Sequence, residues 1–352
     1  MAYTTIDDPS AHFQIALYTG NQTARSITND GNSDLQPDWV WDKNRDSAGY
    51  HHNAYDSSRG VGKQLRPNTI EAEISQAQGV TAFNSDGFSL GTDDSSNETS
   101  SEYVAWQWKA NGGSRTTNAE DGNNPAGGYQ ANTTAGFSIV DYVGTGAAGT
   151  MAHGLGAVPS LIIIKNRDET DSWGVYHSAN TSAPETDYLV FNEVDATADD
   201  ATYWNDTAPT SSVFTVATAH NVNADAENYI AYCFTPIQGY SKFGSYTGNG
   251  NADGAFIYTG FKPAFVIAKK TNSTAGWLML DNKREPSNAI AKFVEVCESG
   301  AEASSSDRVD FLSNGFKCRG TVQPNVSNGT YIYLAFAESP FVTSGGVPCT
   351  AR

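Results

Sequence analysis

Val158-Pro159-Ser160-Leu161-Ile162-Ile163-Ile164-Lys165-Asn166-Arg167-Asp168 is a strand-like stretch that occurs three times in the chain. Its counterparts are Gln36–Asp46 (QPDWVWDKNRD) and Lys262–Asn272 (KPAFVIAKKTN), and the spacing from Pro to Lys is the same in all three. A short apolar run, rich in β-branched and aromatic residues, that begins at Pro and ends at a polar Lys corner is typical of a buried strand. The sequence therefore predicts three equivalent buried strands.

Further landmarks follow each copy in the same order. An aromatic strand comes first, then a turn with a Phe, and finally a closing strand preceded by an Asn. The Asn and the closing strand are, in chain order, Asn97 with Tyr103–Trp108, Asn223 with Tyr229–Phe234, and Asn325 with Tyr331–Phe336. A repeat of roughly 100 residues is too long for a solenoid unit and suits an independently cored domain. We therefore expect an all-β fold of three tandem antiparallel β-sandwich-like modules.

The repeat predicts the domain boundaries. The expected segments are an N-terminal arm at 1–12, a first β module at 13–110, a linker at 111–135, a second module at 136–238, a third module at 239–337 and a C-terminal strap at 338–352. The linker is rich in Gly, Asn and Thr and poor in apolar residues. One helical turn is expected, over residues 69–74.

The closing strands of the second and third modules are apolar on both faces. Successive side chains of a strand point to opposite faces, so both faces of these strands should be buried. One face is expected to meet the core of its own module, and the other a neighbouring module or subunit.

Charge and composition exclude several classes of partner. The chain has 39 acidic and 21 basic side chains, for a formal net charge of −18. This charge repels phosphates and anionic lipids, so we expect no nucleic acid and no membrane as partner. The N-terminus lacks the basic and apolar regions of a signal peptide, and no run approaches the roughly 20 apolar residues of a membrane span. Synthesis and folding in a cytoplasm, without a signal sequence, are expected.

The cysteines do not form a repeated framework, because all four lie in the second half of the chain and the first module has none. Cys297 and Cys318 flank a connection in the third module. We interpret them as small apolar side chains in preference to a disulfide, and their redox state stays open.

The six histidines form no metal-binding pattern such as His-x-x-x-His. His51 and His52 lie on the strand where Trp173 and Trp277 stand in the other copies. This placement favours aromatic side chains on a sheet surface over metal ligands.

Other motifs with chemical associations are also weak. Gly144–Gly149 has the Gly-x-Gly-x-x-Gly spacing, but no helix is expected after it, so dinucleotide binding is not expected. Acidic doublets such as Asp93-Asp94 do not recur and are interpreted as solvated loop charge, not as a glycosidase pair. The loop Asn29–Asp34 offers oxygens to Ca²⁺ without the EF-hand spacing, and calcium stays an open alternative. We expect no catalytic residue, no cofactor and no metal site.

The polar corner that ends each repeated strand is the remaining candidate. It combines Lys43 with Arg45, Lys165 with Arg167, and Lys269 with Thr271. A catalytic group would be unusual in three copies of which one is altered. We expect a structural corner that pairs with Asp56 or Asp281 across the strand hairpin.

Four segments carry a resemblance to a known family: Met1–Phe13, Pro37–Asp46, Tyr103–Ala110 and Val347–Arg352. Together they resemble a repeated β module of unassigned function that is found in virion structural proteins of tailed phages, notably phages of marine bacteria and cyanobacteria. The resemblance covers nearly the whole chain. It implies membership of a virion and supplies no catalytic residue.

These observations favour a non-enzymatic virion structural protein on the particle surface, either a capsid decoration or an appendage component. Its partners would be other virion proteins and further copies of itself, with a trimer favoured. One terminal segment would dock on a neighbouring subunit or on the virion. The alternative is a tail-fibre receptor-binding protein whose exposed Trp and Tyr side chains stack on a host surface glycan.

Overall fold

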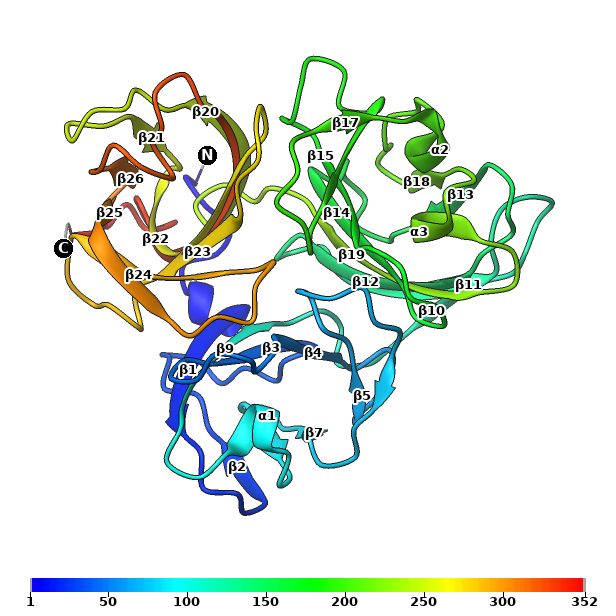
Figure 1. Ribbon diagram of the computed structural model, residues 1–352, viewed down its shortest axis with the longest axis horizontal. Helices are drawn as coiled ribbons and strands as arrows, with labels where there is room; N and C mark the ends of the chain where they lie inside the picture. Colours follow the sequence, from blue (N-terminus) through cyan, green and yellow to red (C-terminus); the bar gives the residue numbers. More distant parts are fainter. Residues whose placement is uncertain (1, 351–352) are drawn as a thin grey trace.

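The structure is a computed structural model that describes residues 2–350, without the side chains of residues 305 and 306. Met1 of the predicted arm and the last two residues of the predicted strap lie outside the described residues. All strand pairs in the described part are antiparallel, which confirms the all-β prediction. Figure 1 shows three lobes around a common centre. We call them lobe 1 (residues 13–108), lobe 2 (127–234) and lobe 3 (241–340).

The strands are short and follow one another through loops. The first part of the chain contains η1 (Pro9–Ala11), β1 (Phe13–Thr19), β2 (Arg25–Ile27), β3 (Trp39–Asn44), β4 (Asn53–Asp56), β5 (Lys63–Gln64), β6 (Ile74–Ser75), β7 (Val80–Phe83), β8 (Phe88–Leu90), α1 (Asp94–Asn97) and β9 (Glu102–Trp108). The middle part contains β10 (Thr116–Asn118), β11 (Gly127–Asn132), β12 (Phe137–Val143), β13 (Gly149–Ala152), β14 (Leu161–Asn166), β15 (Gly174–His177), β16 (Asp187–Val190), β17 (Ala198–Asp199), α2 (Ala201–Trp204), β18 (Val213–Val216), α3 (His220–Asn223) and β19 (Asn228–Phe234). The last part contains β20 (Ser241–Thr247), β21 (Phe256–Tyr258), β22 (Phe261–Lys270), β23 (Trp277–Asp281), β24 (Ile290–Glu295), β25 (Ala303–Leu312), β26 (Gly315–Cys318) and β27 (Thr330–Pro340).

Each lobe has four neighbouring strands in the same order. These orders are β1-β9-β3-β4, β12-β19-β14-β15 and β20-β27-β22-β23. The closing strand therefore lies between the opening strand and the strand of the repeated stretch in every lobe. Pro37 and Pro159 stand two residues before β3 and β14, whereas Pro263 lies inside the longer β22 at a shift in strand register.

Two segments differ from the sequence expectation. The stretch predicted as a linker supplies the whole of β10 and β11, and β11 pairs with β12, so these residues extend the sheet of lobe 2. The helical turn predicted over residues 69–74 is wrong, because Ile74 begins the short strand β6. Local helical spacing of apolar residues is too weak a signal over six positions to compete with strand pairing.

The repeated strands alternate between two cores. In β14, Ile162 and Ile164 pack into a core that belongs to lobe 2. Leu161 and Ile163 point the other way, into a core to which all three lobes contribute. The second face of these strands is therefore buried within the chain, against neighbouring lobes.

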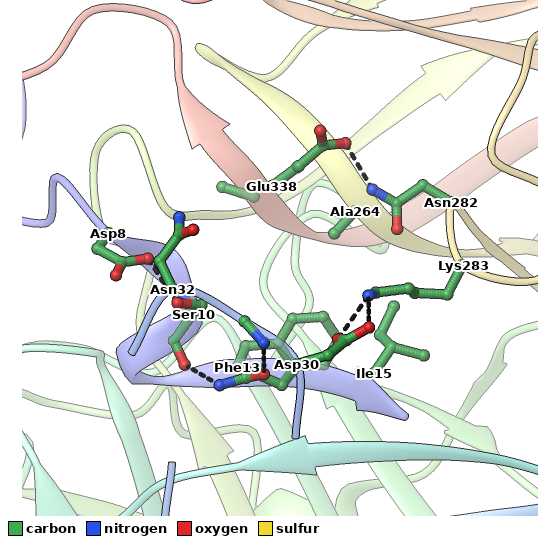
Figure 2. A pocket seen from close by; sticks show the side chains of 13 residues that line it. Asp8, Ser10, Phe13, Ile15, Asp30, Asn32, Ala264, Asn282, Lys283 and Glu338 are labelled. Carbon is green, nitrogen blue, oxygen red and sulfur yellow. Dashed lines mark hydrogen bonds and ion pairs between the residues drawn. The ribbon is translucent and has the colours of Figure 1, made fainter. Parts of the chain in front are cut away.

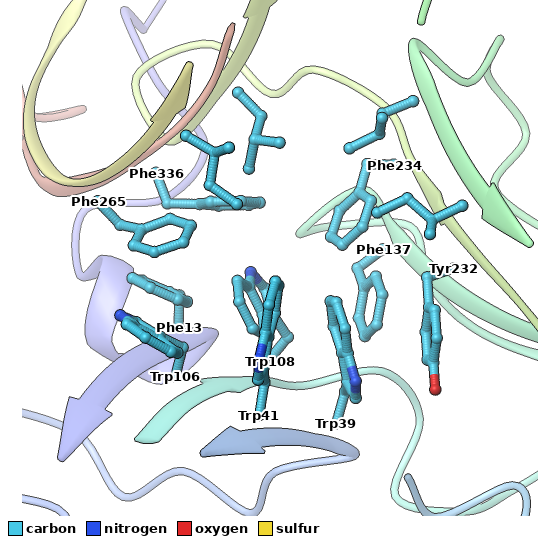
Figure 3. Close-up of a cluster of buried hydrophobic side chains, with 14 of the residues drawn as sticks. Phe13, Trp39, Trp41, Trp106, Trp108, Phe137, Tyr232, Phe234, Phe265 and Phe336 are labelled. Atoms are coloured by element: carbon cyan, nitrogen blue, oxygen red, sulfur yellow. The ribbon is translucent and has the colours of Figure 1, made fainter. Parts of the chain in front are cut away.

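Aromatic side chains dominate this shared core (Figure 3). Trp39 of lobe 1 stacks on Tyr232 of lobe 2 with 4.3 Å between ring centroids. Phe13 lies 5.2 Å from Phe336 of lobe 3, and Phe234 lies 5.8 Å from the same ring. Large buried aromatic rings contribute the most to such a core, so the three lobes stabilise one another.

The N-terminal arm packs on its own chain. The hydroxyl of Thr4 donates to the carbonyl of Gln238 at 2.8 Å, and the side chain of Ile6 is 3% exposed within the shared core. Asp7 accepts hydrogen bonds from the backbone and hydroxyl of Ser344 in the C-terminal segment. These residues of the arm therefore pack on the lobes of their own chain, because Ile6 is an apolar side chain that the centre of the molecule can bury.

A buried asparagine connects two loops in each lobe. In lobe 2 the side chain of Asn223 accepts from the backbone N–H of Thr145 at 2.9 Å and donates to the carbonyl of Ala217 at 2.7 Å. Asn97 and Asn325 make the matching pairs of bonds in lobes 1 and 3. This role explains why the three asparagines recur at matched positions in the sequence.

Replacing Asn223 with alanine is expected to lower the free energy of unfolding by about 1–3 kcal/mol, because buried backbone groups lose their partners. The midpoint of urea unfolding measures the effect. An Asn111→Ala variant at an exposed position is the control and should change stability by less than about 0.5 kcal/mol. Equal midpoints for the two variants would contradict the role given to Asn223.

Candidate functional site

The boundaries between lobes contain polar side chains at positions that the sequence repeats. We call them seam 1–2, seam 3–1 and seam 2–3 after the lobes that meet there. One backbone hydrogen bond occurs in all three seams: Glu73 N to Arg167 O at 2.8 Å, Glu302 N to Arg45 O at 2.7 Å, and Thr197 N to Thr271 O at 2.9 Å. Because this bond occurs in all three seams, it identifies which residues of one seam correspond to which residues of the others.

Seam 1–2 contains a buried network of charges. The Arg59 guanidinium is buried between Asp56 and Glu73. Arg167 of lobe 2 contacts Glu73 at 2.8 Å, and the Tyr232 hydroxyl donates to Asp56 at 2.7 Å. Burial by itself would lower the pKa of Arg59, but the two carboxylates raise it above its usual range. Arg59 therefore stays charged, and its pairing makes the burial of Asp56 tolerable.

Seam 3–1 has the same arrangement with different partners. The Arg284 guanidinium is buried between Asp281 and Glu302. Arg45 of lobe 1 contacts Glu302 at 3.0 Å, and the Trp106 indole donates to Asp281 at 3.2 Å. Burial would raise the pKa of Glu302, but the neighbouring arginines hold it below its ordinary value.

Seam 2–3 has neutral side chains at these four positions. His177 stands where the other seams have Asp, and its Nε2 lies 3.1 Å from the carbonyl of Tyr333. Asn180 stands where they have Arg, and it accepts from the Thr197 hydroxyl at 2.7 Å. Thr197 and Thr271 take the places of Glu and Arg. The polar contacts at these positions are thus hydrogen bonds between neutral groups.

The lysines of the repeated corner do not pair with Asp56 or Asp281, so that prediction is wrong. Lys43, Lys165 and Lys269 are buried and donate to backbone carbonyls instead, at distances of 2.7 Å to Asn44, 2.6 Å to Asn166 and 2.8 Å to Val194. Burial lowers the pKa of each ammonium to about 8. The aspartates are unavailable because arginines three residues later in the chain already neutralise them.

An aromatic N–H crosses each seam. His52, Trp173 and Trp277 are buried, and their ring nitrogens reach the carbonyls of Glu295 at 3.1 Å, Arg66 at 3.2 Å and Val190 at 2.9 Å. Trp41 donates to Nδ1 of His52, so the proton of this imidazole lies on Nε2. The interpretation of His52 as a sheet-surface aromatic is wrong, because a neighbouring lobe covers that surface. His51 is half-buried beside Asn68.

Acid is expected to destabilise the protein partly through His177. Burial lowers the pKa of this imidazole to about 4, whereas the unfolded chain binds the proton near pH 6.5. Its contribution to stability is therefore complete above pH 6.5 and is lost as the pH falls toward 4, with a slope that approaches about 1.4 kcal/mol per pH unit. A His177→Gln variant keeps a neutral donor and should lose less stability between pH 7 and 4.5. Urea unfolding at both pH values measures this difference, and equal losses in the two proteins would contradict it.

A cleft of about 160 Å³ lies between lobes 1 and 3 beneath the arm (Figure 2). The Asn29–Asp34 loop forms part of its wall. Asp30 pairs with Lys283 at 2.6 Å, and Asn29 accepts from Gln107 at 2.6 Å, so these loop oxygens face separate partners. Among residues 2–350, no group of three or more His, Cys, Asp or Glu side chains is placed to hold a metal ion.

The remaining sequence candidates are dispersed. The Gly144–Gly149 segment connects β12 to β13, and Asp93-Asp94 begins the short helix α1. Cys297 and Cys318 are both free. In the described part of the chain, no helix is long and apolar enough to cross a membrane.

The exposed aromatic side chains differ from the expectation, which included exposed tryptophans. All seven tryptophans are buried: Trp39, Trp41, Trp106, Trp108, Trp173, Trp204 and Trp277. The large aromatic side chains that the described surface does expose are Phe256 at 48% and Tyr258 at 47%, both on β21. Stacking of a glycan on tryptophan therefore has no exposed side chain to use.

The sequence analysis singled out Arg45 and Arg167 as part of the repeated corner. It missed the other two arginines of the charged seams, Arg59 and Arg284, and both glutamates. One signal was present, since the Asp-x-x-Arg spacing occurs at both Asp56 and Asp281. The glutamates carried no comparable signal, because Glu73 and Glu302 follow these motifs at different distances. Only the fold brings them to the seams.

The chain was compared with models of known protein families. A family model described as a domain of unknown function, DUF7483, matches residues 8–340. A search of curated proteins finds no match to the chain.

Proposed function

We propose that this chain, which belongs to the DUF7483 family, is a non-enzymatic structural protein of a phage virion. In this role it is displayed on the particle surface, as a capsid decoration or as a component of an appendage. Its partners are other virion proteins. The sequence resemblance to a module of tailed-phage virion proteins supports this assignment.

The observation that carries the proposal is that the repeated polar side chains are bound to other groups of the same protein. Arg59, Arg284 and the three corner lysines are buried, and their partners belong to the protein itself. Side chains engaged in this way stabilise the protein and are not free to meet a substrate. Three lobes fixed around one core suit a protein that occupies a surface and makes contacts.

We also propose that the three lobes are copies of one module. The matching strand orders and the recurrent asparagines support this proposal. So does a stacked tyrosine pair with 5.1 Å between ring centroids in every lobe: Tyr18 with Tyr103, Tyr142 with Tyr229, and Tyr246 with Tyr331. Three copies in one chain would give a single protein the pseudo-threefold arrangement of a trimer.

Assembly of several chains, with a trimer favoured, stays part of the proposal. The two-sided strands no longer require it, since their second faces are buried within the chain. The support that remains is the exposed pair Phe256 and Tyr258, because exposed aromatic side chains are common in contact surfaces. The mass of the full-length protein in solution distinguishes a 37.6 kDa monomer from an oligomer.

A tail-fibre receptor-binding protein that recognises a host surface glycan is the alternative. The specific observation in its favour is the neutral, hydroxyl-rich lining of seam 2–3. Hydroxyl and amide groups both donate and accept hydrogen bonds, as sugars do.

Purified virions provide the test. We expect peptides of the chain in the virion proteome and immunogold label on the head or along an appendage. Label at the tail tip would favour the receptor-binding alternative. Absence of the chain from particles that were purified intact would contradict both roles.

A further inference from the structure

Seam 2–3 contains a groove of about 410 Å³ that has no charged residue in its lining. The lining residues are Ala179, Asn180, Thr181, Ser245, Tyr246, Thr247, Thr271, Thr330 and Tyr331. A volume of this size falls within the roughly 300–1,000 Å³ that is usual for small-molecule sites. The hydroxyls of Ser245 and Thr247 lie on exposed residues at the end of β20.

The groove lies where the other two seams are filled by charged side chains. Thr271 occupies the position of Arg45 and Arg167, as the shared backbone hydrogen bond shows. Asn180 occupies the position of Arg59 and Arg284, three residues after the end of the matching strand. Two long guanidinium side chains are therefore replaced by short neutral ones at one seam, and space remains at the surface between the lobes.

The walls of the groove are held in place by the protein. The hydroxyl of Thr271 lies 2.9 Å from that of Thr330, and Asn180 is fixed by its bond to Thr197. Tyr246 stacks on Tyr331 with 11° between the ring planes. Residues 235–240 connect lobes 2 and 3 directly. A preorganised lining of this kind reduces the entropy that binding would cost.

The chemistry of the lining selects a ligand class. Threonine and serine hydroxyls and the Asn180 amide can both donate and accept hydrogen bonds. The half-buried ring of Tyr246 adds an apolar wall that can contact C–H faces, and the fully buried Tyr331 supports this ring from inside the protein. The lining offers no cation to a phosphate or a carboxylate, and the net charge of −18 repels anions in general. A neutral molecule with many hydroxyl groups fits these conditions best.

We propose that the groove at seam 2–3 binds neutral hexose oligosaccharides through Asn180, Thr247, Thr271 and the ring of Tyr246, which stacks on the buried Tyr331. Sugar binding here does not require the chain to belong to a virion. Failure at the groove would be seen in ligand titrations, whereas failure of the virion role would be seen on labelled particles.

Threonine-methyl NMR of the full-length chain is the test, because four threonines line the groove. Maltotetraose, cellotetraose and chitotetraose are titrated separately up to about 10 mM, and tetragalacturonate is the anionic comparison. We expect saturable shifts of the Thr181, Thr247, Thr271 and Thr330 methyl signals with at least one neutral sugar, at a dissociation constant on the order of 1 mM. The anionic sugar should bind at least tenfold more weakly.

Two variants and one control connect binding to the groove. Asn180→Ala with Thr247→Ala removes hydrogen-bonding groups and should weaken binding at least tenfold. Thr197→Glu with Thr271→Arg restores the charged pair of the other seams and should abolish binding by filling the groove. Thr19→Ala changes the matching exposed position at the end of β1 in lobe 1 and should leave binding unchanged.

Three results would overturn the proposal. One is the absence of shifts in the four groove methyls with every neutral sugar. Another is binding that survives in the Asn180→Ala, Thr247→Ala protein, which is expected to fold because Thr247 is exposed and Asn180 is only half-buried. The third is equal or tighter binding of tetragalacturonate.

Discussion

Replacing Arg284 with methionine is expected to lower the free energy of unfolding by about 3–5 kcal/mol. The guanidinium is fully buried and neutralises Asp281, which is also fully buried, and it contacts Glu302 at 3.4 Å. Methionine has a similar length but no charge. The Asp281 carboxylate would then remain buried without its cation, and this is the main cause of the expected loss. Unfolding in guanidinium chloride, followed by tryptophan fluorescence, measures this loss of stability.

Lys317→Met is the matched control, because it removes a cation from an ion pair whose acidic partner is exposed. Asp253 in that pair is 80% exposed, so solvent screens the pair and the change should cost far less than Arg284→Met. A double Asp281→Asn, Arg284→Met variant should recover part of the loss, since no charge is left unpaired. If Arg284→Met cost no more than Lys317→Met, the buried network would not stabilise seam 3–1.

Replacing Ile6 with alanine is expected to lower the free energy of unfolding by about 2–5 kcal/mol, although this residue lies near the end of the chain. Its side chain fills part of the shared core between the lobes, where relaxation around a cavity is limited. Removal of residues 2–8 should have at least the same effect. The midpoint of thermal unfolding by circular dichroism measures both changes.

Asp7→Ala tests whether the lost stability comes from the buried Ile6 side chain or would follow from any change in the arm. Asp7 is exposed and bonds only to Ser344 among the described residues, so its removal should cost far less than the Ile6→Ala change. A loss below about 0.5 kcal/mol for Ile6→Ala would show that the arm does not contribute to the shared core.

Much of the fold could be predicted from the sequence because buried strands have a recognisable pattern, a short apolar run that begins at Pro. Pro37, Pro159 and Pro263 marked strands that lie next to the closing strand in each lobe. The two apolar faces of Tyr229–Phe234 correctly indicated burial on both sides. What the pattern could not specify was whether another lobe or another subunit covers the second face, since both environments are equally apolar.

The seams could not be predicted in the same way. Arg167 and Glu73 are 94 positions apart, and their contact depends on how two lobes pack, which no local spacing encodes. The corner lysines were misassigned because an ammonium near a repeated aspartate suggests an ion pair. In the structure the buried lysines donate to backbone carbonyls. The two aspartates pair with Arg59 and Arg284 instead.

The differences among the seams were partly visible in the sequence. Thr271 stood out as a change from the Arg45 and Arg167 pattern, and His177 as a change from Asp56 and Asp281. The sequence could not show that these changes meet at one seam. It also could not show that Asn180 and Thr197 join them there, because neither residue belongs to a motif.

Differential scanning calorimetry of the full-length chain tests most directly whether the three lobes form one body around a shared core. We expect a single transition in which the calorimetric and van't Hoff enthalpies agree, because no lobe can expose its share of the core without destabilising the others. Two or three separate transitions, or a calorimetric enthalpy about three times the van't Hoff value, would show that the lobes unfold independently and would contradict the account.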